Sequence, residues 1–290
     1  MTAGAGLDVV LVTHSRAPDL DADEAALGPA LGRRGISWRA VPWDGAADAF
    51  DWSSARLVVL RSPWNYSRRR EAFLQWAGRV ADVAHLHNPI DVVRSNTHKG
   101  YLLDLATRGV PVVPTLLVRP ADAEGLKERV RALGWDDIVV KPAVSAGSWR
   151  TWRLSRGEPS HHWTRARRLL ATREALVQPF LPAVIQDGEK ALVFFDGEFS
   201  HAIRKRSLFE PPEAPLRVPA EARPDEIDLA LNALKAAGAE GLLYARVDVA
   251  AGPGGAPLLM ELELTEPRLF FGAAPEGAIE RFAGAIAARV

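Results

Sequence analysis

Short apolar runs rich in β-branched residues alternate with segments of helical periodicity along most of the chain. The run LDVVLVT, at 7–13, ends in a polar loop, and the helical pattern after it stops at Gly35. Further strands are predicted at 36–41 and 56–61, and a second helix at 69–83. Because strands and helices follow one another in this way, residues 1–93 are expected to form a small open α/β lobe.

The segment HNPIDVVRSNTHKG, at 87–100, is the clearest boundary in the chain. An Asn-Pro pair punctuates it, and three consecutive residues at 95–97 favour the cap of a new helix. The alternation then continues, so the whole chain is expected to be α/β or α+β in several lobes. Helices are predicted at 99–109, after 125, at 161–172, at 224–238 and at the C-terminus. Strands are predicted at 112–118, 137–142, 151–154, 175–180, 242–250 and 257–264, with a hairpin at 190–205 and a Pro-rich passage at 211–224.

The composition argues against several classes of binding partner and of chemistry. Lys plus Arg and Asp plus Glu number 36 each, so no overall charge attracts nucleic acid or a membrane surface. The chain has no cysteine, which excludes disulfides, thiolate nucleophiles and thiolate metal ligands. It has no run of about 18 apolar residues and no basic start followed by a long apolar stretch. We therefore expect a cytoplasmic protein that acts on a small molecule, with a homodimer left open.

The stretch PLLMELELTEP, at 257–267, places carboxylates in a strand that should be buried. Glu261 and Glu263 are expected on one face, about 6.6 Å apart, because side chains alternate along a strand. If the preceding strand pairs antiparallel through the turn AAGPGGA, Asp248 joins them. Oxygen ligands without His or Cys suit Mg²⁺, as one ion or as two close together. The alternative is a salt-bridge network with Arg204, Arg246 or Arg268.

Cations and backbone donors for a phosphate precede this stretch. Lys141 ends the apolar strand IVVKP, and the loop VSAGS, at 144–148, has small residues that let N–H groups approach a phosphate closely. Ordinary roles also fit these residues. The loop can be a simple turn, Lys99 a surface lysine at a helix start, and Lys205 a charged residue of an edge strand.

Six segments occur in the order and at the separations typical of the ATP-grasp superfamily of ATP-dependent ligases, which the chain resembles over about residues 94–271. They are THKGYLLDLATRGVPVVPT, IVVKPAVSAGS, LVQPFLP, GEKALVFFDGEFSHAIRK, YARVDVA and MELELTEP. The resemblance implies an ATP-grasp fold of three lobes, with ATP between the second and the third. These are an N-terminal α/β substrate lobe at 1–93, a central α+β lid domain at 94–180 and a C-terminal lobe with the metal site at 181–290.

The resemblance also implies which residues bind ATP and the metal. The expected ligands of the ATP phosphates are Lys99, Lys141, Ser145, Gly147 and Ser148. The hinge whose backbone reads adenine is expected at Gln178, Phe180 and Leu181, and the ribose ligand is Glu189. The expected Mg²⁺ ligands are Asp248, Glu261 and Glu263.

The implied reaction has two steps. A substrate carboxylate attacks the γ-phosphate, and an amine-type nucleophile then displaces the acyl phosphate, releasing ADP and phosphate. Arg246 stands two residues before the metal Asp, as in D-alanine:D-alanine ligases, and is expected to steady the charge that develops on the acyl phosphate. Lys205 or Arg204 would neutralise phosphate. No protein nucleophile is expected, because such a transfer depends on position and charge.

Three features depart from the family pattern. Most relatives have Asn where Glu263 stands, and the extra carboxylate should tighten the metal site. Relatives have Gly after the Pro where this chain has Arg268, which is expected to bind a substrate acid. The loop at 144–148 is poor in Gly, so the resemblance leaves the phosphate geometry open.

The substrate pocket is expected at LRSPWNY, after the third strand, because open sheets bind ligands at the carboxyl ends of their strands. Arg61 offers a carboxylate fork beside the aromatic walls of Trp64 and Tyr66. A capped turn with a packed Trp fits this stretch equally well. The stretch is similar to a subgroup of small bacterial ATP-grasp proteins that includes the ring-closing ligase of cycloserine biosynthesis. Further candidates are His14, Asp44, Asn65 and Arg217.

The favoured function is an ATP-dependent ligase that forms a C–N bond. It would join an amino-acid-like carboxylate to an amine-type nucleophile, either between two molecules or within one. A nucleotide-binding protein with an inactive ligase fold is the alternative, and the presence of Lys99, Lys141, Asp248 and Glu261 argues against it. A dinucleotide oxidoreductase is disfavoured because no Gly-x-Gly-x-x-Gly follows any strand.

Overall fold

The structure is a computed structural model that describes residues 6–46, 50–155, 160–210 and 216–290. Its N-terminal lobe contains a parallel sheet in the order β2-β1-β3-β4. The strands are β1 (Leu7–Thr13), β2 (Trp38–Pro42), β3 (Ala55–Leu60) and β4 (His85–His87), and the helices are α1 (Leu27–Arg33), α2 (Arg70–Ala81) and α3 (Ile90–Asn96). Successive residues of β1 enter different cores, because side chains alternate between the two faces of a strand. Both faces of this sheet are therefore covered.

The C-terminal lobe contains an antiparallel sheet in the order β11-β10-β9-β12-β13. Its elements are β9 (Glu189–Phe195), β10 (Glu198–Lys205), β11 (Arg217–Ala220), β12 (Tyr244–Ala251), β13 (Pro257–Glu263), α7 (Ala183–Gln186), α8 (Pro224–Ala236) and α9 (Ala278–Ala287). Asp196 and Gly197 turn the predicted hairpin with positive φ angles of 54° and 79°. Of the Pro-rich passage, residues 211–215 lie outside the described residues.

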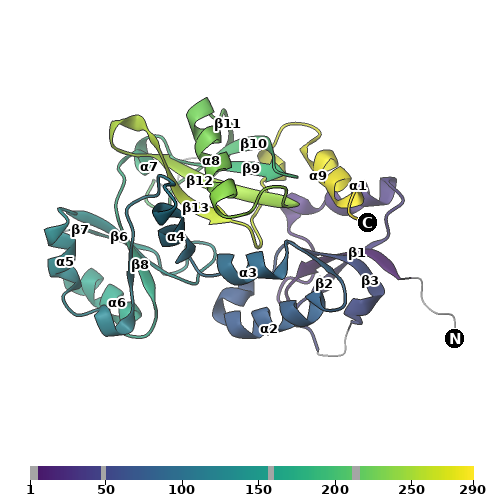
Figure 1. Ribbon diagram of the computed structural model, residues 1–290, viewed down its shortest axis with the longest axis horizontal. Coiled ribbons are helices and arrows are strands. Elements are labelled where there is room, and N and C mark those ends of the chain that lie inside the picture. The colour runs from purple at the N-terminus through teal and green to yellow at the C-terminus, as the bar shows by residue number, and fades with distance from the viewer. Residues whose placement is uncertain (1–5, 47–49, 156–159, 211–215) are drawn as a thin grey trace.

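The central domain contains a third sheet, in the order β5-β8-β6-β7. Its strands are β5 (Leu116–Val118), β6 (Asp137–Pro142), β7 (Trp152–Ser155) and β8 (Ala175–Pro179), and its helices are α5 (Leu126–Ala132) and α6 (Ser160–Leu170). The two helices share one apolar core with this sheet, a core to which no buried residue of the other lobes belongs within the described ranges. Figure 1 shows this domain at one end of the molecule and the N-terminal lobe at the other.

The N-terminal and C-terminal lobes share an apolar core. Leu27 and Leu31 of α1 pack with Phe282 and Ile286 of α9, and the same core includes residues of β1 and β9. The two helices lie side by side in Figure 1. The N-terminal and C-terminal lobes are therefore joined by a continuous apolar core.

Two segments differ from the sequence prediction. The stretch 87–100, predicted as a boundary, contains the helix α3. The strand predicted at 112–118 begins only at Leu116, because Val112 instead forms a bridge to Leu259 of β13. The helix α4 (Tyr101–Thr107) packs on the C-terminal sheet. The division of the chain at 93 and 180 stays a prediction. Among the described helices, none has the length and apolar character needed to cross a membrane.

Candidate active site

A cavity of about 1170 Å³ lies where the three lobes meet. This volume exceeds the range of about 300–1,000 Å³ typical of a pocket for one small ligand. Seventeen of the residues predicted for ATP, metal, catalysis or substrate line it, namely Trp64, Tyr66, Lys99, Lys141, Ser145, Gly147, Ser148, Gln178, Phe180, Leu181, Glu189, Lys205, Arg246, Asp248, Glu261, Glu263 and Arg268. The fold thus brings together residues that are far apart in the sequence.

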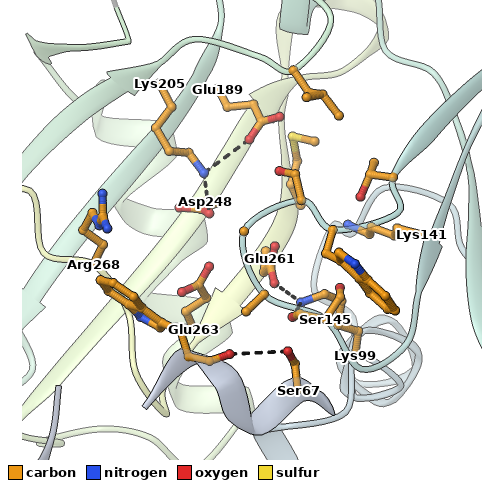
Figure 2. A pocket seen from close by; sticks show the side chains of 18 of the residues that line it. Ser67, Lys99, Lys141, Ser145, Glu189, Lys205, Asp248, Glu261, Glu263 and Arg268 are labelled. Atoms are coloured by element: carbon orange, nitrogen blue, oxygen red, sulfur yellow. Dashed lines mark hydrogen bonds and ion pairs between the residues drawn. The ribbon is translucent and has the colours of Figure 1, made fainter. Parts of the chain in front are cut away.

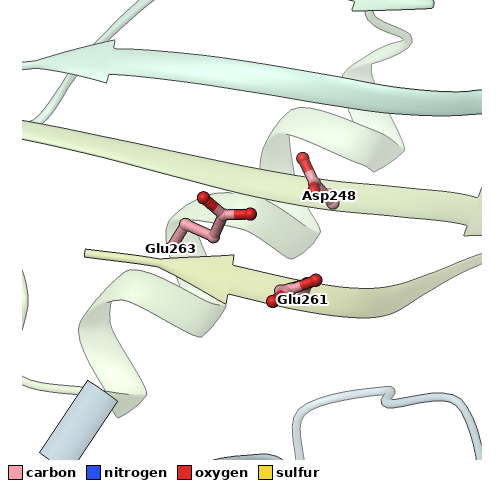
Figure 3. Close-up of side chains that lie close together, drawn as sticks. All are labelled: Asp248, Glu261 and Glu263. Carbon is pink, nitrogen blue, oxygen red and sulfur yellow. The ribbon is translucent and has the colours of Figure 1, made fainter. Parts of the chain in front are cut away.

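Three carboxylates converge on one side of this cavity. The strands β12 and β13 pair antiparallel, with Asp248 opposite Glu261 and Arg246 opposite Glu263. One oxygen of each acid, Asp248, Glu261 and Glu263, lies within 4.8 Å of the others (Figure 3). We call these three residues the carboxylate triad.

Three basic side chains face the triad. Lys99 pairs with Glu261, and Arg246 pairs with Glu263 and, at 2.9 Å, with Asp248. Lys205 lies 2.6 Å from Asp248 (Figure 2). The predicted salt-bridge network is therefore present for Arg246, whereas Arg204 pairs with Glu210 and Arg268 pairs with Asp21. Within the described residues each acid of the triad has a cationic partner in the chain.

The charges set the pKa values of the triad. Burial works to raise the pKa of Glu261, but the ammonium groups of Lys99 and Lys141 outweigh burial and lower it to about 2. Burial likewise opposes ionisation of Asp248, and Arg246 and Lys205 lower its pKa. Burial and the charge of Glu261 raise the pKa of Glu263 above its usual value, against the effect of Arg246. Asp248 and Glu261 are therefore anionic near neutral pH.

The triad fits a hard divalent cation. Its donors are all carboxylate oxygens, and Mg²⁺ prefers a few such oxygens together with water and substrate phosphate. All three residues line the cavity, so a cation held there would face a bound substrate.

The phosphate side of the cavity carries Lys141, at the end of β6. Burial lowers its pKa, and within the described part of the chain no ion pair or hydrogen bond of its ammonium is recorded. The backbone of the adjoining loop is unusual, because Gly147 and Ser148 both have positive φ, at 61° and 57°. Lys99 holds this loop by donating to the Ser145 carbonyl at 3.3 Å. The arrangement offers a cation and exposed backbone donors to an anion.

The predicted hinge lines another part of the cavity. The Phe180 N–H donates to the Asp137 carbonyl at 2.9 Å, and the Gln178 amide donates to the Thr115 hydroxyl at 2.9 Å. Phe180 and Leu181 belong to an apolar cluster with Val113 and Ala250. Glu189, at the start of β9, lies 3.3 Å from Lys205. The hinge therefore has its own packing on the C-terminal sheet.

Two residues expected at the site lie elsewhere. The Arg61 side chain is fully buried, and it pairs with Glu24 and donates to the Pro267 carbonyl at 2.9 Å. It is not among the residues that line the cavity, so its prediction as a substrate ligand is corrected. Arg204 points away from the cavity, to the Asp187 carbonyl and to Glu210 at 2.8 Å, which corrects its catalytic prediction.

The wall opposite the phosphate side combines aromatic rings with guanidinium groups. The Arg268 guanidinium lies 4.7 Å from the ring centre of Trp64, and Arg217 lies 5.0 Å from that of Phe270. Figure 2 shows Lys141 and Arg268 on opposite sides of the triad. An arginine stacked on a ring keeps the edge of its guanidinium available for an anion.

The further candidates from the sequence all line the cavity; they are His14, Asp44, Asn65 and Arg217. Asp44 accepts hydrogen bonds from the Ser15 N–H at 2.7 Å and from the Asn65 amide at 2.7 Å. These bonds, together with a pair to Arg69, lower the pKa of Asp44 although burial opposes them. Asp44 therefore fixes the loop that carries His14 against the segment after β3.

Glu266 is a cavity residue that the sequence analysis did not assign. Its exposed fraction is 8%, and it lines the cavity beside Tyr66. Burial, and next the charge of Glu263, raise the pKa of Glu266 to about 8. Its position just beyond a strand that carries two other carboxylates is the sequence feature that could have indicated a role at the site.

Comparisons with known proteins place this site in a family. Residues 9–88 match the model of the N-terminal domain of the D-cycloserine synthetase DcsG. The cycloserine biosynthesis protein DcsG of Streptomyces lavendulae is 35% identical over 97% of this chain and 98% of its own. The crystal structure of D-cycloserine synthetase DcsG has a TM-score of 0.87 at 33% identity, covering 97% of this chain and 99% of that one.

More distant structures share the fold alone. The ATP-grasp ligase PsnB, in a complex with minimal precursor, Mg and ADP, has a TM-score of 0.66 at 20% identity and covers 98% of this chain and 99% of its own. The D-alanine–D-alanine ligase of Bacillus anthracis has a TM-score of 0.69 at 13% identity, over 98% of this chain and 97% of that one. The fold predicted from the sequence, ATP-grasp, is confirmed.

The chain therefore has the fold of the ATP-grasp ligases. Within them, the chain belongs to the family of the D-cycloserine synthetase DcsG. ATP-dependent ligation is accordingly its class of reaction.

Proposed function

We propose that the protein uses Mg²⁺ and ATP to activate the carboxylate of an amino-acid-like small molecule as an acyl phosphate, which an amine-type nucleophile then displaces. The products would be a C–N bond, ADP and phosphate. The observation that carries the proposal is the half-buried ammonium of Lys141, which shares one cavity with the triad. A cation that forms no ion pair with any described residue, opposite a cluster of acids, fits a polyphosphate bound through a divalent ion.

Residues on the two sides of the triad would have different roles in binding and transfer. Lys99, Lys141 and the loop at 145–148 would hold the phosphates, while the backbone of the hinge at 178–181 would read the adenine. When bound, Mg²⁺ would neutralise phosphate charge from the triad. Arg246, held by Asp248 and by stacking 5.2 Å from the Phe270 ring centre, would face the charge that develops during transfer.

Glu189 and Lys205 complete the proposed nucleotide site. Glu189 would accept the ribose hydroxyls, and Lys205, which the structure pairs with both Glu189 and Asp248, would bind phosphate once the metal takes over Asp248. A bound cation would supply the counter-charge of Asp248 in place of the ammonium, which would leave Lys205 available for phosphate.

The central test is Glu261→Gln, which keeps the size of the side chain and removes its charge. We expect loss of Mg²⁺-dependent ADP release by at least about a hundredfold, because charge stabilisation is the main contribution of such a site. The matched control is Glu276→Gln, since Glu276 is exposed and outside the cavity. Wild-type turnover by Glu261→Gln would remove the metal assignment.

Ring closure within one molecule is the second candidate. The match to DcsG over 97% of the chain favours it, since DcsG is a D-cycloserine synthetase. Product analysis by mass spectrometry separates the two reactions. Intramolecular ligation gives a product from one substrate, whereas intermolecular ligation needs a second compound before ADP is released.

A further inference from the structure

Glu266 is set apart from the other acids of the cavity by its surroundings. It comes three residues after Glu263, where the chain leaves β13 and meets the N-terminal lobe. The Trp64 indole N–H donates to the Glu266 carbonyl at 3.2 Å and so fixes this part of the backbone. The side chain is more than nine-tenths buried and still lines the cavity.

Glu266 has no ion-pair partner within the described residues, although the ammonium of Lys99 is near enough to work against the rise of its pKa. Every acid of the triad has an ammonium or guanidinium within ion-pair distance, whereas none is recorded for Glu266 among the residues described. Its hydrogen-bond partner is the buried hydroxyl of Tyr66. A carboxylate accepts about four hydrogen bonds, so one phenol leaves most of its capacity unused. A buried carboxylate of this kind is costly unless a cation or several donors meet it.

A guanidinium on the same wall provides the opposite charge. Trp64 connects the two groups, because its indole N–H holds the Glu266 backbone and its ring lies under the Arg268 guanidinium. Arg268 has one carboxylate partner, Asp21 at 3.1 Å, and keeps further N–H groups for an anion. Trp64 thus contacts both an acidic residue, Glu266, and a basic residue, Arg268. A ligand that carries one positive and one negative group would complement this pair.

We propose that Glu266 and Tyr66 form the binding site for a primary ammonium group of the substrate, with Arg268 facing an anionic group of the same molecule. The inference rests on the proposed ligase function and deepens it. It assigns recognition of the amino group of the amino-acid-like substrate to named residues, and so makes that group a requirement for binding. The ammonium would supply the cation and the N–H donors that Glu266 lacks.

Matched pairs of compounds test this site. Each pair consists of an amino acid and the same compound without its amino group. Examples are D- or L-serine with 3-hydroxypropionate, and D- or L-alanine with propionate. Binding is followed by thermal shift in the presence of Mg²⁺ and ADP, and turnover by ADP release. We expect the amino member to bind and react at least tenfold better in one or more pairs. Equal responses within every pair, including no response to any amino compound, would overturn the proposal.

Variants then separate this site from the nucleotide site. Glu266→Gln should lower the response to the amino member at least tenfold through KM, leaving the KM for ATP and the Mg²⁺ requirement unchanged, with Glu276→Gln as the control. If Glu266→Gln shifts the Mg²⁺ requirement instead, Glu266 is a metal ligand and the inference is wrong. Tyr66→Phe should reproduce part of the loss.

Failure of the inference is distinguishable from failure of the ligase function. Binding of ATP, measured by calorimetry without any second substrate, tests the ligase function alone. A protein that binds Mg²⁺ and ATP and releases ADP with the amino and the des-amino members alike remains a ligase without an ammonium site.

Discussion

The N-terminal lobe and the central domain are attached to the C-terminal sheet in different ways. The N-terminal lobe shares an apolar core with that sheet, and buried polar side chains such as Arg61 and Asn88 donate across the boundary to Pro267 and Leu264. The central sheet has a core of its own with α5 and α6, and it meets the C-terminal sheet through the small cluster around Phe180 and through Leu117 and Leu176, which reach the core of that sheet. The substrate wall of the cavity is therefore built into the main body, whereas the wall that carries Lys141 belongs to a unit whose main core is its own.

This difference in packing suits the two ligands of the proposed reaction, the small substrate and ATP. A wall fixed by a continuous core can hold a small substrate in one orientation, which is the main requirement of a transfer reaction. A wall on a separate unit can approach a large nucleotide after it enters, because local units with few shared contacts open at low cost. The comparison predicts that polar substitutions at the two attachments differ strongly in effect.

Arg61→Met is expected to have the largest effect. Arg61 is fully buried and pairs with Glu24, so its removal leaves an uncompensated carboxylate in the core. We expect a loss of about 3–5 kcal/mol in the free energy of unfolding, measured by urea denaturation. The double variant Arg61→Met, Glu24→Gln should recover part of this loss, because it removes the unpaired charge. A single variant as stable as the wild type would contradict the buried attachment.

Glu266, at the boundary between the N-terminal and C-terminal lobes, is expected to make the free energy of unfolding depend on pH. The pKa of Glu266 rises from 4.5 to about 8 on folding, so between these values the folded state binds one proton more than the unfolded state. Stability contributed by this group is present below about pH 4.5 and is lost as the pH rises toward 8. Each pKa unit corresponds to about 1.4 kcal/mol.

The measurement compares wild type with Glu266→Gln by urea denaturation from pH 5 to pH 9, without Mg²⁺ and nucleotide. Wild type should lose stability relative to the variant as the pH rises through this window. The control Glu276→Gln changes an exposed carboxylate and should run parallel to wild type. Parallel curves for Glu266→Gln would show that Glu266 is ionised throughout.

Sequence patterns predicted most of the secondary structure and the triad, because both depend on local periodicity and on hairpin pairing. The antiparallel pairing of β12 and β13 follows from a turn signal between two apolar runs, which also brings Asp248 opposite Glu261. Arg61 shows the limit of this reasoning. Its partner Glu24 is 37 residues away, and no pattern within LRSPWNY distinguishes a buried ion pair from a substrate ligand.

Arg204 was wrongly predicted as catalytic, and Glu266 was left unassigned, for related physical reasons. Lys205, next in the strand to Arg204, faces the cavity, so Arg204 must face the other way, and choosing between neighbours requires the register of β10 against β9. Glu266 lies after the strand ends, where alternation no longer indicates direction. Its burial depends on Tyr66 and Trp64 from another lobe, a tertiary contact that local sequence does not encode.

Lys141→Met tests the wall carried by the central domain. Its ammonium has no recorded partner within the described residues, so its loss should cost little in folding and much in nucleotide binding. We expect ATP affinity, measured by calorimetry, to fall by about 1.5–3 kcal/mol, the contribution typical of a charged hydrogen bond. Thermal unfolding without ligand serves as the control and should be nearly unchanged. Unchanged affinity would mean that the loop at 144–148 does not bind phosphate.

Arg153→Met is expected to have the smallest effect, and it matches Arg61→Met in chemistry. Arg153 pairs with Asp137 at 2.6 Å, but about a third of each side chain is exposed, so water screens the pair. Methionine can keep the packing against the Phe180 ring, whose centre lies 3.8 Å from the guanidinium carbon. We expect a loss below about 1 kcal/mol by urea denaturation. Because the same substitution is made in both lobes, similar losses for Arg61→Met and Arg153→Met would show that the buried and the half-exposed ion pair contribute alike to stability.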